Sequence, residues 1–186
     1  MAGMNEFMAR LDVAALCDYI AERGHIEPYA KGVELVREGR LCRQIGIVKS
    51  GYFKFVSLTS NGDEAVTGFS FEGEVVTDYP RTFMLGKPSL STIVAGCDAE
   101  VAQVSLAEAR EYLQRVNPAF EKVTTEVLLT EAYQRYIDMH IKSPAERYQE
   151  LIQRHDGVVG LLTLQEIASY LGISRRQLHR IKAAYG

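Results

Sequence analysis

The stretch from Thr163 to Gly186, TLQEIASYLGISRRQLHRIKAAYG, has the spacing of two short helices joined by a tight turn. Gly172 suits the turn, and Ala168, four residues earlier, is small enough to let the two helices cross closely. Apolar residues occupy the positions that such a motif buries: Ile167, Leu171, Ile173, Leu178 and Ile181. The pattern predicts a helix-turn-helix, a motif that commonly places its second helix on DNA.

Both predicted helices carry start signals. Thr163 and Glu166 have the spacing of a capping box, and Ser174 is placed to cap the second helix, which contains no acidic residue. An ordinary amphipathic helix pair with a solvated basic face is the alternative. We expect DNA contacts from the polar residues of this motif: Thr163, Ser174, Arg175, Arg176, Gln177, His179, Arg180 and Lys182.

The distribution of charge supports a DNA-binding C-terminal region attached to an acidic N-terminal region. Of the 21 Lys and Arg and 24 Asp and Glu, residues 143–186 hold six bases and four acids (net +2), which leaves 15 bases and 20 acids (net −5) for residues 1–142. The three cysteines, Cys17, Cys42 and Cys97, lack metal-site spacing, so we expect no metal and no cofactor. No apolar run reaches the roughly 20 residues of a membrane span. The expectation is a cytoplasmic protein without membrane contact.

The region before this motif reads as a β-domain. Short alternating runs separated by glycines are typical of a jelly-roll barrel, and Asn61-Gly62 marks a hairpin because both residues tolerate positive φ. We predict an N-terminal β-barrel domain with flanking helices over residues 1–116. The expected strands are Val33–Arg37, Gln44–Lys49, Tyr52–Leu58, Ala65–Phe71, Ser91–Ala95 and Val101–Ser105.

A long helix is expected over residues 117–142, between the β-domain and the helix-turn-helix domain of residues 143–186. Ser105 and Glu108 form a second capping box for the helix before it, and Asn117-Pro118 reads as the cap and first turn of the long helix. This helix has two apolar stripes, which favours two partners: the β-domain and a second copy of the chain. A helix buried in a monomer is the alternative. Ser143-Pro144 ends it, and Ser143 and Glu146 cap the next helix.

The order of parts resembles the Crp/Fnr family of bacterial transcription regulators. The similarity lies in Val36–Gly39, Gly51, Phe71–Glu74 and, most closely, Ser143–Tyr148 and Ile167–Ser174. It implies an α+β fold with an N-terminal jelly-roll β-barrel sensor domain, a long dimerisation helix and a C-terminal helix-turn-helix domain. It also implies a homodimer that binds double-stranded DNA and contacts RNA polymerase, and is not an enzyme.

The same resemblance identifies candidate effector-binding residues: Gly73, Glu74, Ser89 and Ser91. Family members that bind cyclic AMP pair its phosphate with an arginine, but here the corresponding segment reads Pro88-Ser89-Leu90-Ser91. A buried phosphate without that partner is costly, so we expect no binding of cyclic AMP. A cyclic-nucleotide-responsive regulator remains one alternative. A cupin-like metal enzyme is another, although the β region has no histidine after His25.

The second helix departs from the commonest family pattern, Arg-Glu-x-x-x-Arg. Arg175 and Arg180 match the two arginines, but Arg176 replaces the glutamate. Glutamate accepts from cytosine, whereas arginine donates to guanine N7 and O6. The sequence therefore predicts an altered half-site, with guanine opposite Arg176.

Overall fold

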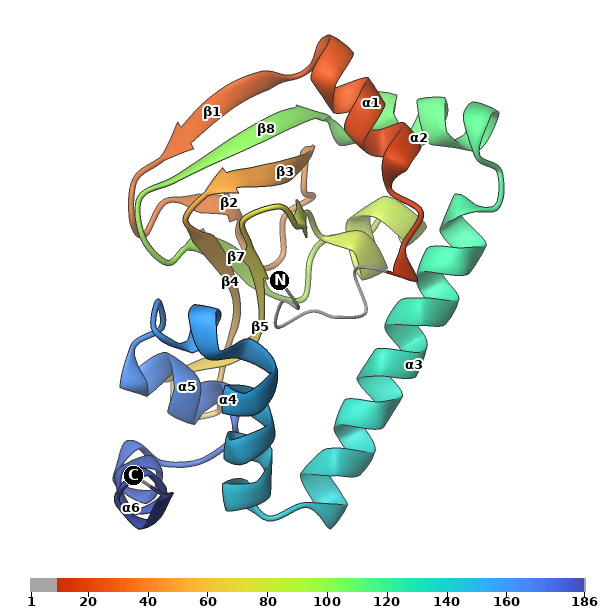
Figure 1. The fold of residues 1–186 in the computed structure, drawn as a ribbon. Coiled ribbons are helices and arrows are strands. Elements are labelled where there is room, and N and C mark those ends of the chain that lie inside the picture. Colours follow the sequence, from red (N-terminus) through yellow and green to blue (C-terminus); the bar gives the residue numbers. More distant parts are fainter. Residues whose placement is uncertain (1–9, 186) are drawn as a thin grey trace.

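The computed structural model describes residues 10–185, and the side chains of all of these except 154–156, 158 and 185. The ends of the expected domains 1–116 and 143–186, residues 1–9 and 186, lie outside this description. Within it, eight strands form two four-stranded antiparallel sheets of a jelly-roll-like sandwich (Figure 1). The first sheet has the order β1 (His25–Tyr29), β8 (Ala99–Ser105), β3 (Gln44–Ser50), β6 (Val75–Val76), and the second has the order β2 (Glu34–Val36), β7 (Thr92–Ala95), β4 (Tyr52–Leu58), β5 (Glu64–Phe71).

All six strands expected from the sequence are present, within two residues of their predicted ends. Strands β1 and β6 were missed. β1 is an edge strand whose first four residues are exposed and which contains Pro28, so it carries no alternation to detect. β6 spans only two residues, too few for a periodic signal.

The two faces of β4 have different neighbours, which fixes the positions of both functional regions. Phe53 and Phe55 point to the interior of the sandwich, where Phe53 is fully buried. Tyr52 and Val56, on the opposite face, belong to a second apolar cluster formed with the C-terminal helices. The hairpin that joins β4 to β5 turns at Gly62 (φ 84°). Asn61 does not share this positive φ, so the expected use of both residues was wrong, and a loop of residues 59–63 replaces a two-residue turn.

Helices α1 (Ala14–Arg23) and α2 (Leu106–Val116) pack on one end of the sandwich, and α3 (Phe120–Ile141) runs along its side (Figure 1). Two predicted caps are wrong. The Ser105 side chain makes no capping hydrogen bond to α2. Asn117 ends α2, with its amide N–H bonded to the Leu113 carbonyl and its side chain to Asp12, so α3 begins three residues later than expected.

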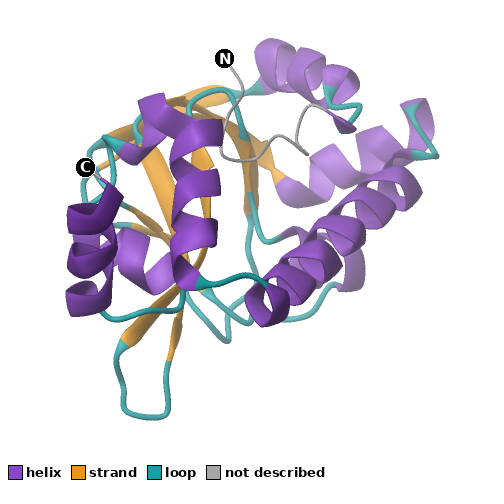
Figure 2. Cartoon of the chain, turned by 60° about the horizontal axis from the view of Figure 1, so that its bottom comes forward, coloured by secondary structure: helices purple, strands orange, loops and turns teal. Residues whose placement is uncertain are grey.

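The C-terminal helices are α4 (Pro144–Val159), α5 (Leu164–Tyr170) and α6 (Arg175–Tyr185). The predicted cap at Ser143 is confirmed, because its hydroxyl donates to Glu146 and accepts from the Glu146 amide. The strands lie between groups of helices on two sides, with the C-terminus in one of these groups (Figure 2).

Helix α5 lies directly on the free edge of β5. A β-bulge between Phe55 and Val56 shifts the β4–β5 register near Thr67. The Val66 amide donates to Ser169 Oγ of α5 at 2.8 Å, and the Thr67 carbonyl accepts from Arg135 of α3 at 2.6 Å. Two neighbouring helices thus satisfy backbone groups that an edge strand would otherwise expose.

Candidate functional site

The helix-turn-helix has the local geometry that its sequence predicts. Gly172 adopts φ 68° at the turn, and Ala168 is completely buried where α5 and α6 approach each other. Thr163 and Glu166 form both halves of the capping box, and Ser174 Oγ accepts from the Gln177 amide at 3.2 Å. These short-range bonds fix the start of each helix, and therefore the direction in which α6 presents its side chains.

All eight candidate DNA-binding residues are exposed. Six of them lie on α6, and Ser174 immediately precedes it, while Thr163 lies at the start of α5. Leu178 lies between these exposed residues in sequence and is completely buried, so the helix has a buried apolar side and an open polar side. Seven of the eight residues therefore lie on α6 or directly before it.

The cations of α6 form no ion pair with the side chains that the structure describes. None of the ion pairs among those side chains involves Arg175, Arg176, Arg180 or Lys182. Arg175 and Arg176 also occupy the first turn of α6, where the helix dipole disfavours positive charge and no acidic residue compensates. This arrangement costs folding energy and presents concentrated positive charge to solvent, which suits an anionic partner.

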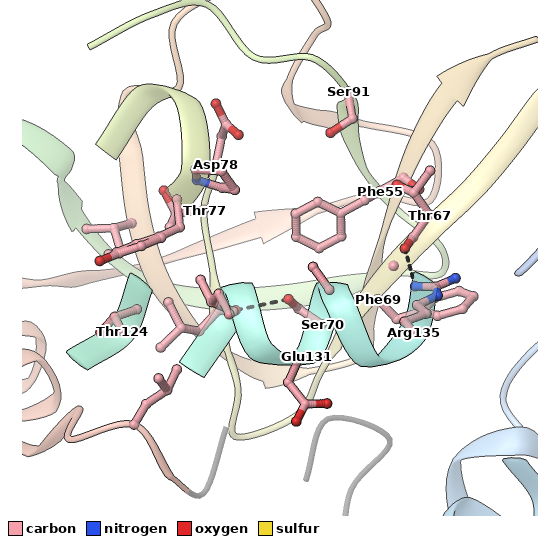
Figure 3. A pocket seen from close by; sticks show the side chains of 18 of the residues that line it. Phe55, Thr67, Phe69, Ser70, Thr77, Asp78, Ser91, Thr124, Glu131 and Arg135 are labelled. Carbon is pink, nitrogen blue, oxygen red and sulfur yellow. Dashed lines mark hydrogen bonds between the residues drawn. The ribbon is translucent and has the colours of Figure 1, made fainter. Parts of the chain in front are cut away.

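A second candidate site is a cavity of about 440 Å³ that is partly open to solvent. It lies between β4, β5, the π-helical turn η2 (Tyr79–Phe83) and α3. Aromatic rings supply much of its lining, and Figure 3 shows the ring of Phe55 in the middle of the site. The volume is in the range of small-molecule sites, roughly 300–1,000 Å³.

Of the four candidate effector-binding residues, Ser91 lines this cavity, and Gly73, Glu74 and Ser89 do not. Gly73 and Glu74 form the β5–β6 turn, in which a Glu74 carboxylate oxygen accepts from the Phe71 amide at 2.9 Å. Ser89 is 2% exposed, and its hydroxyl donates to the Ser91 carbonyl at 2.7 Å. These bonds hold the backbone around the cavity, so three of the four residues shape it from outside.

Among the lining residues that the sequence reasoning missed are Asp78, Arg135 and Tyr170. Asp78 had a detectable signal, because it is an acidic residue in the otherwise uncharged run Val75–Pro80. Arg135 and Tyr170 had none. They lie on α3 and α5, far along the chain from β4 and β5, and only the packing of these helices brings them to the cavity wall.

The first helix of the motif is attached to the sandwich through its own cap. Tyr52 Oη donates to Glu166 Oε2 at 3.1 Å, and Lys54 Nζ lies 3.5 Å from Glu166 Oε1. Burial of the phenol, reinforced by the negative charge of Glu166, raises the pKa of Tyr52. The capping glutamate of α5 is therefore also a bridge to β4.

Comparison with known proteins agrees with this architecture. Residues 26–116 match the family model of the cyclic nucleotide-binding domain. A search of curated proteins found no match. No helix among residues 10–185 is long and apolar enough to cross a membrane.

Solved structures extend the similarity to nearly the whole chain. The c-di-GMP responsive global regulator CLP of Xanthomonas campestris has a TM-score of 0.68 and 16% identity over 94% of this chain and 91% of its own. A putative transcriptional regulator of the Crp/Fnr family from Eubacterium rectale has a TM-score of 0.67 and 19% identity, over 92% of this chain and 82% of its own. FixK2 of Bradyrhizobium japonicum has a TM-score of 0.66 and 18% identity, over 87% of this chain and 83% of its own. The chain thus shares the fold of these regulators, and its residues 26–116 are similar to a cyclic nucleotide-binding domain.

Proposed function

We propose that this protein is a homodimeric, sequence-specific DNA-binding transcription regulator of the Crp/Fnr type, controlled by a small molecule other than cyclic AMP. The observation that carries the DNA-binding part is the exposed face of α6, where unpaired cations follow a correctly capped helix-turn-helix. In this motif the N-terminal part of the second helix enters the major groove. Arg175 and Arg176 lie at that end, so phosphate and base contacts offset the unfavourable helix-dipole interaction.

Dimerisation through α3 follows from its exposed apolar residues. Leu129, Tyr133, Tyr136 and Ile141 are all more than half exposed in the single chain. Such a surface on a 22-residue helix suits a second copy of the same helix, because a twofold pair buries identical faces together. A dimer would place two α6 helices on half-sites about one helical turn apart, roughly 34 Å.

The effector part rests on the cavity, which is bounded by β4, β5, α3 and Tyr170 of α5. A ligand in this cavity would touch the DNA-binding motif itself. Cyclic AMP is a poor candidate, because the segment Pro88-Ser89-Leu90-Ser91 contains no arginine where the family pattern has its phosphate-binding one, and the buried Ser89 hydroxyl is bonded to the Ser91 carbonyl. Contact with RNA polymerase and a cytoplasmic location remain predictions.

Fluorescence anisotropy with randomised duplex DNA, followed by selection and sequencing, tests the proposal. We expect enriched near-palindromic sites whose affinity falls steeply with salt, because each phosphate contact releases counterions. The double variant Arg175→Ala/Arg180→Ala should lose this binding. Arg23→Ala/Arg37→Ala, which removes two exposed arginines outside the motif, should keep it. Absence of salt-dependent binding by the parent protein would contradict the proposal, and micromolar cyclic AMP affinity by calorimetry would contradict its effector part.

A further inference from the structure

One arginine side chain joins the C-terminal end of α3 to the helix-turn-helix. Arg147 lies in the first turn of α4, directly after the corner at which α3 ends (Figure 1). Its Nη1 donates to the Lys142 carbonyl at 2.7 Å and to the Met139 carbonyl at 3.4 Å. Its Nη2 donates to the Leu171 carbonyl, at the end of α5, at 3.0 Å. One guanidinium therefore holds the ends of α3 and α5 together.

The ends of these two helices suit a positive charge. Helix dipoles place partial negative charge on the last carbonyls of a helix, which also lack partners within it. Arg147 forms no ion pair among the side chains that the structure describes, so its charge acts on these carbonyls. Its Nε is buried and has no hydrogen-bond partner among those residues, which costs free energy. Arg147 thus stabilises the fold less than its three bonds suggest, while it fixes the relative position of two helix ends.

The end of α3 also touches the turn itself. Gly172 has the positive φ of the turn, and a Cβ added to it would lie 2.9 Å from Met139 Cε of α3. The Tyr170 carbonyl at the end of α5 accepts from Arg135 of α3 at 3.2 Å. Because α6 begins three residues after Gly172, its direction depends on where this turn is held.

A separate contact fixes the corner between α3 and α4. Lys142 Nζ forms ion pairs with Asp138 of α3 at 3.0 Å and with Glu150 of α4 at 2.8 Å. These pairs do not involve Arg147. Removal of the Arg147 guanidinium should therefore leave the corner intact and loosen its connection to the helix-turn-helix.

We propose that Arg147 is a positioning residue that sets the distance between the two half-sites read by a dimer. This inference rests on the proposed function, which pairs two copies through α3 and places α6 on DNA. In such a dimer the separation of the two α6 helices depends on the angle between α3 and the helix-turn-helix in each copy. Half-sites shift only in steps of one base pair, about 3.4 Å along the duplex, so a looser junction accepts more than one spacing.

Fluorescence anisotropy on the full chain with a set of duplexes tests this role. The duplexes carry the half-sites selected by the parent protein at the selected spacing, at spacings changed by one or two base pairs, or as a single half-site. We expect the parent to bind the selected spacing at least about tenfold more tightly than the others, because a wrong spacing prevents both copies from binding at once. Glutamine cannot reach both helix ends, so Arg147→Gln should reduce this preference to about threefold or less. Its affinity for the single half-site should change less than about twofold.

Two further variants separate positioning from stability. Arg110 is also half-buried, pairs with Glu121 and donates to the Met84 carbonyl, but none of these partners belongs to the helix-turn-helix domain. Arg110→Gln should lower the free energy of unfolding and keep the spacing preference. Arg147→Lys keeps a positive charge but lacks the planar fork that reaches both helix ends, so it should broaden the spacing as Arg147→Gln does. It decides the question if Arg147→Gln does not fold.

The outcomes separate this inference from the proposed function. A spacing preference retained in both Arg147 variants overturns the inference, as does an equal loss of preference in Arg110→Gln. Equal loss of affinity for single and paired half-sites also overturns it, because a merely structural role weakens binding to every duplex alike. A parent protein that binds all spacings equally removes the inference and leaves DNA binding. A parent that binds no DNA removes the regulator, and the inference with it.

Discussion

The guanidinium of Arg135 lies 3.9 Å from the centroid of the Tyr170 ring and donates to the Tyr170 carbonyl at 3.2 Å. The same guanidinium donates to the Thr67 carbonyl of β5 at 2.6 Å. One side chain of α3 therefore joins the bulged edge of the sandwich to the end of α5. All three residues line the cavity, so its wall is in direct contact with the first helix of the helix-turn-helix.

Replacing Arg135 by Lys should loosen this junction. Lysine keeps the positive charge but cannot bond two carbonyls and stack on a ring at once. We expect the free energy of unfolding to fall by about 1–3 kcal/mol in denaturant titration, with faster amide hydrogen exchange in residues 164–170. Arg115→Lys is the matched control, because Arg115 also lies over a tyrosine ring, at 5.7 Å, but is exposed. Equal effects of the two substitutions would contradict the proposed role of the junction.

Replacing Tyr52 by Phe removes the hydroxyl that donates to Glu166. The capping box between Thr163 and Glu166 remains, but Glu166 loses the uncharged hydrogen-bond donor that β4 supplies. We expect a loss of about 1–2 kcal/mol in the free energy of unfolding. An unchanged value would show that the contact contributes nothing to docking of α5.

The same residue predicts how stability changes at alkaline pH. In the unfolded chain the Tyr52 phenol deprotonates near pH 10, whereas burial and the charge of Glu166 raise its pKa in the folded protein. Above about pH 10 the unfolded state holds fewer protons than the folded state, so stability falls as pH rises. The decline between about pH 10 and 11.5 should be shallower in Tyr52→Phe than in the parent. Tyr133 is exposed, so Tyr133→Phe should leave the steepness of this decline unchanged.

Arg176 should determine base preference, and Lys182 should contribute affinity without preference. Arg176→Ala is expected to cost about 1–3 kcal/mol on the selected site and to relax the preference at one base pair. Lys182→Ala should weaken binding to all sequences alike and reduce the salt slope by about one. Selection that returns the usual family half-site from the parent protein would show that Arg176 does not alter recognition.

A charge on α3 should dissociate the dimer. Leu129→Glu is expected to yield a monomer in sedimentation velocity and to weaken binding to a two-half-site duplex at least tenfold, because two copies no longer bind as one unit. Leu58→Glu introduces the same charge at a leucine of equal exposure, 67%, that lies on β4. It should leave both properties intact. A monomeric parent protein would contradict dimerisation through α3.

The elements that the sequence predicted well depend on neighbours within a few residues. The caps at Thr163 and Ser143, the turn at Gly172 and six of the strands follow from local hydrogen bonding and alternation. The errors at Ser105 and Asn117 come from competition that the local pattern does not reveal. Asn117, for example, caps the end of α2 and bonds Asp12 instead of starting α3.

The sequence by itself determined the helix-turn-helix, the exposure of its basic residues and the positions of six strands, because spacing along one helix or strand decides which side chains share a face. Only the tertiary structure decided where that motif lies and what lines the cavity. Arg135 and Tyr170 reach the cavity because α3 and α5 pack against the free edge of β5. Contacts between segments distant in the chain depend on packing of whole elements, which no local spacing encodes.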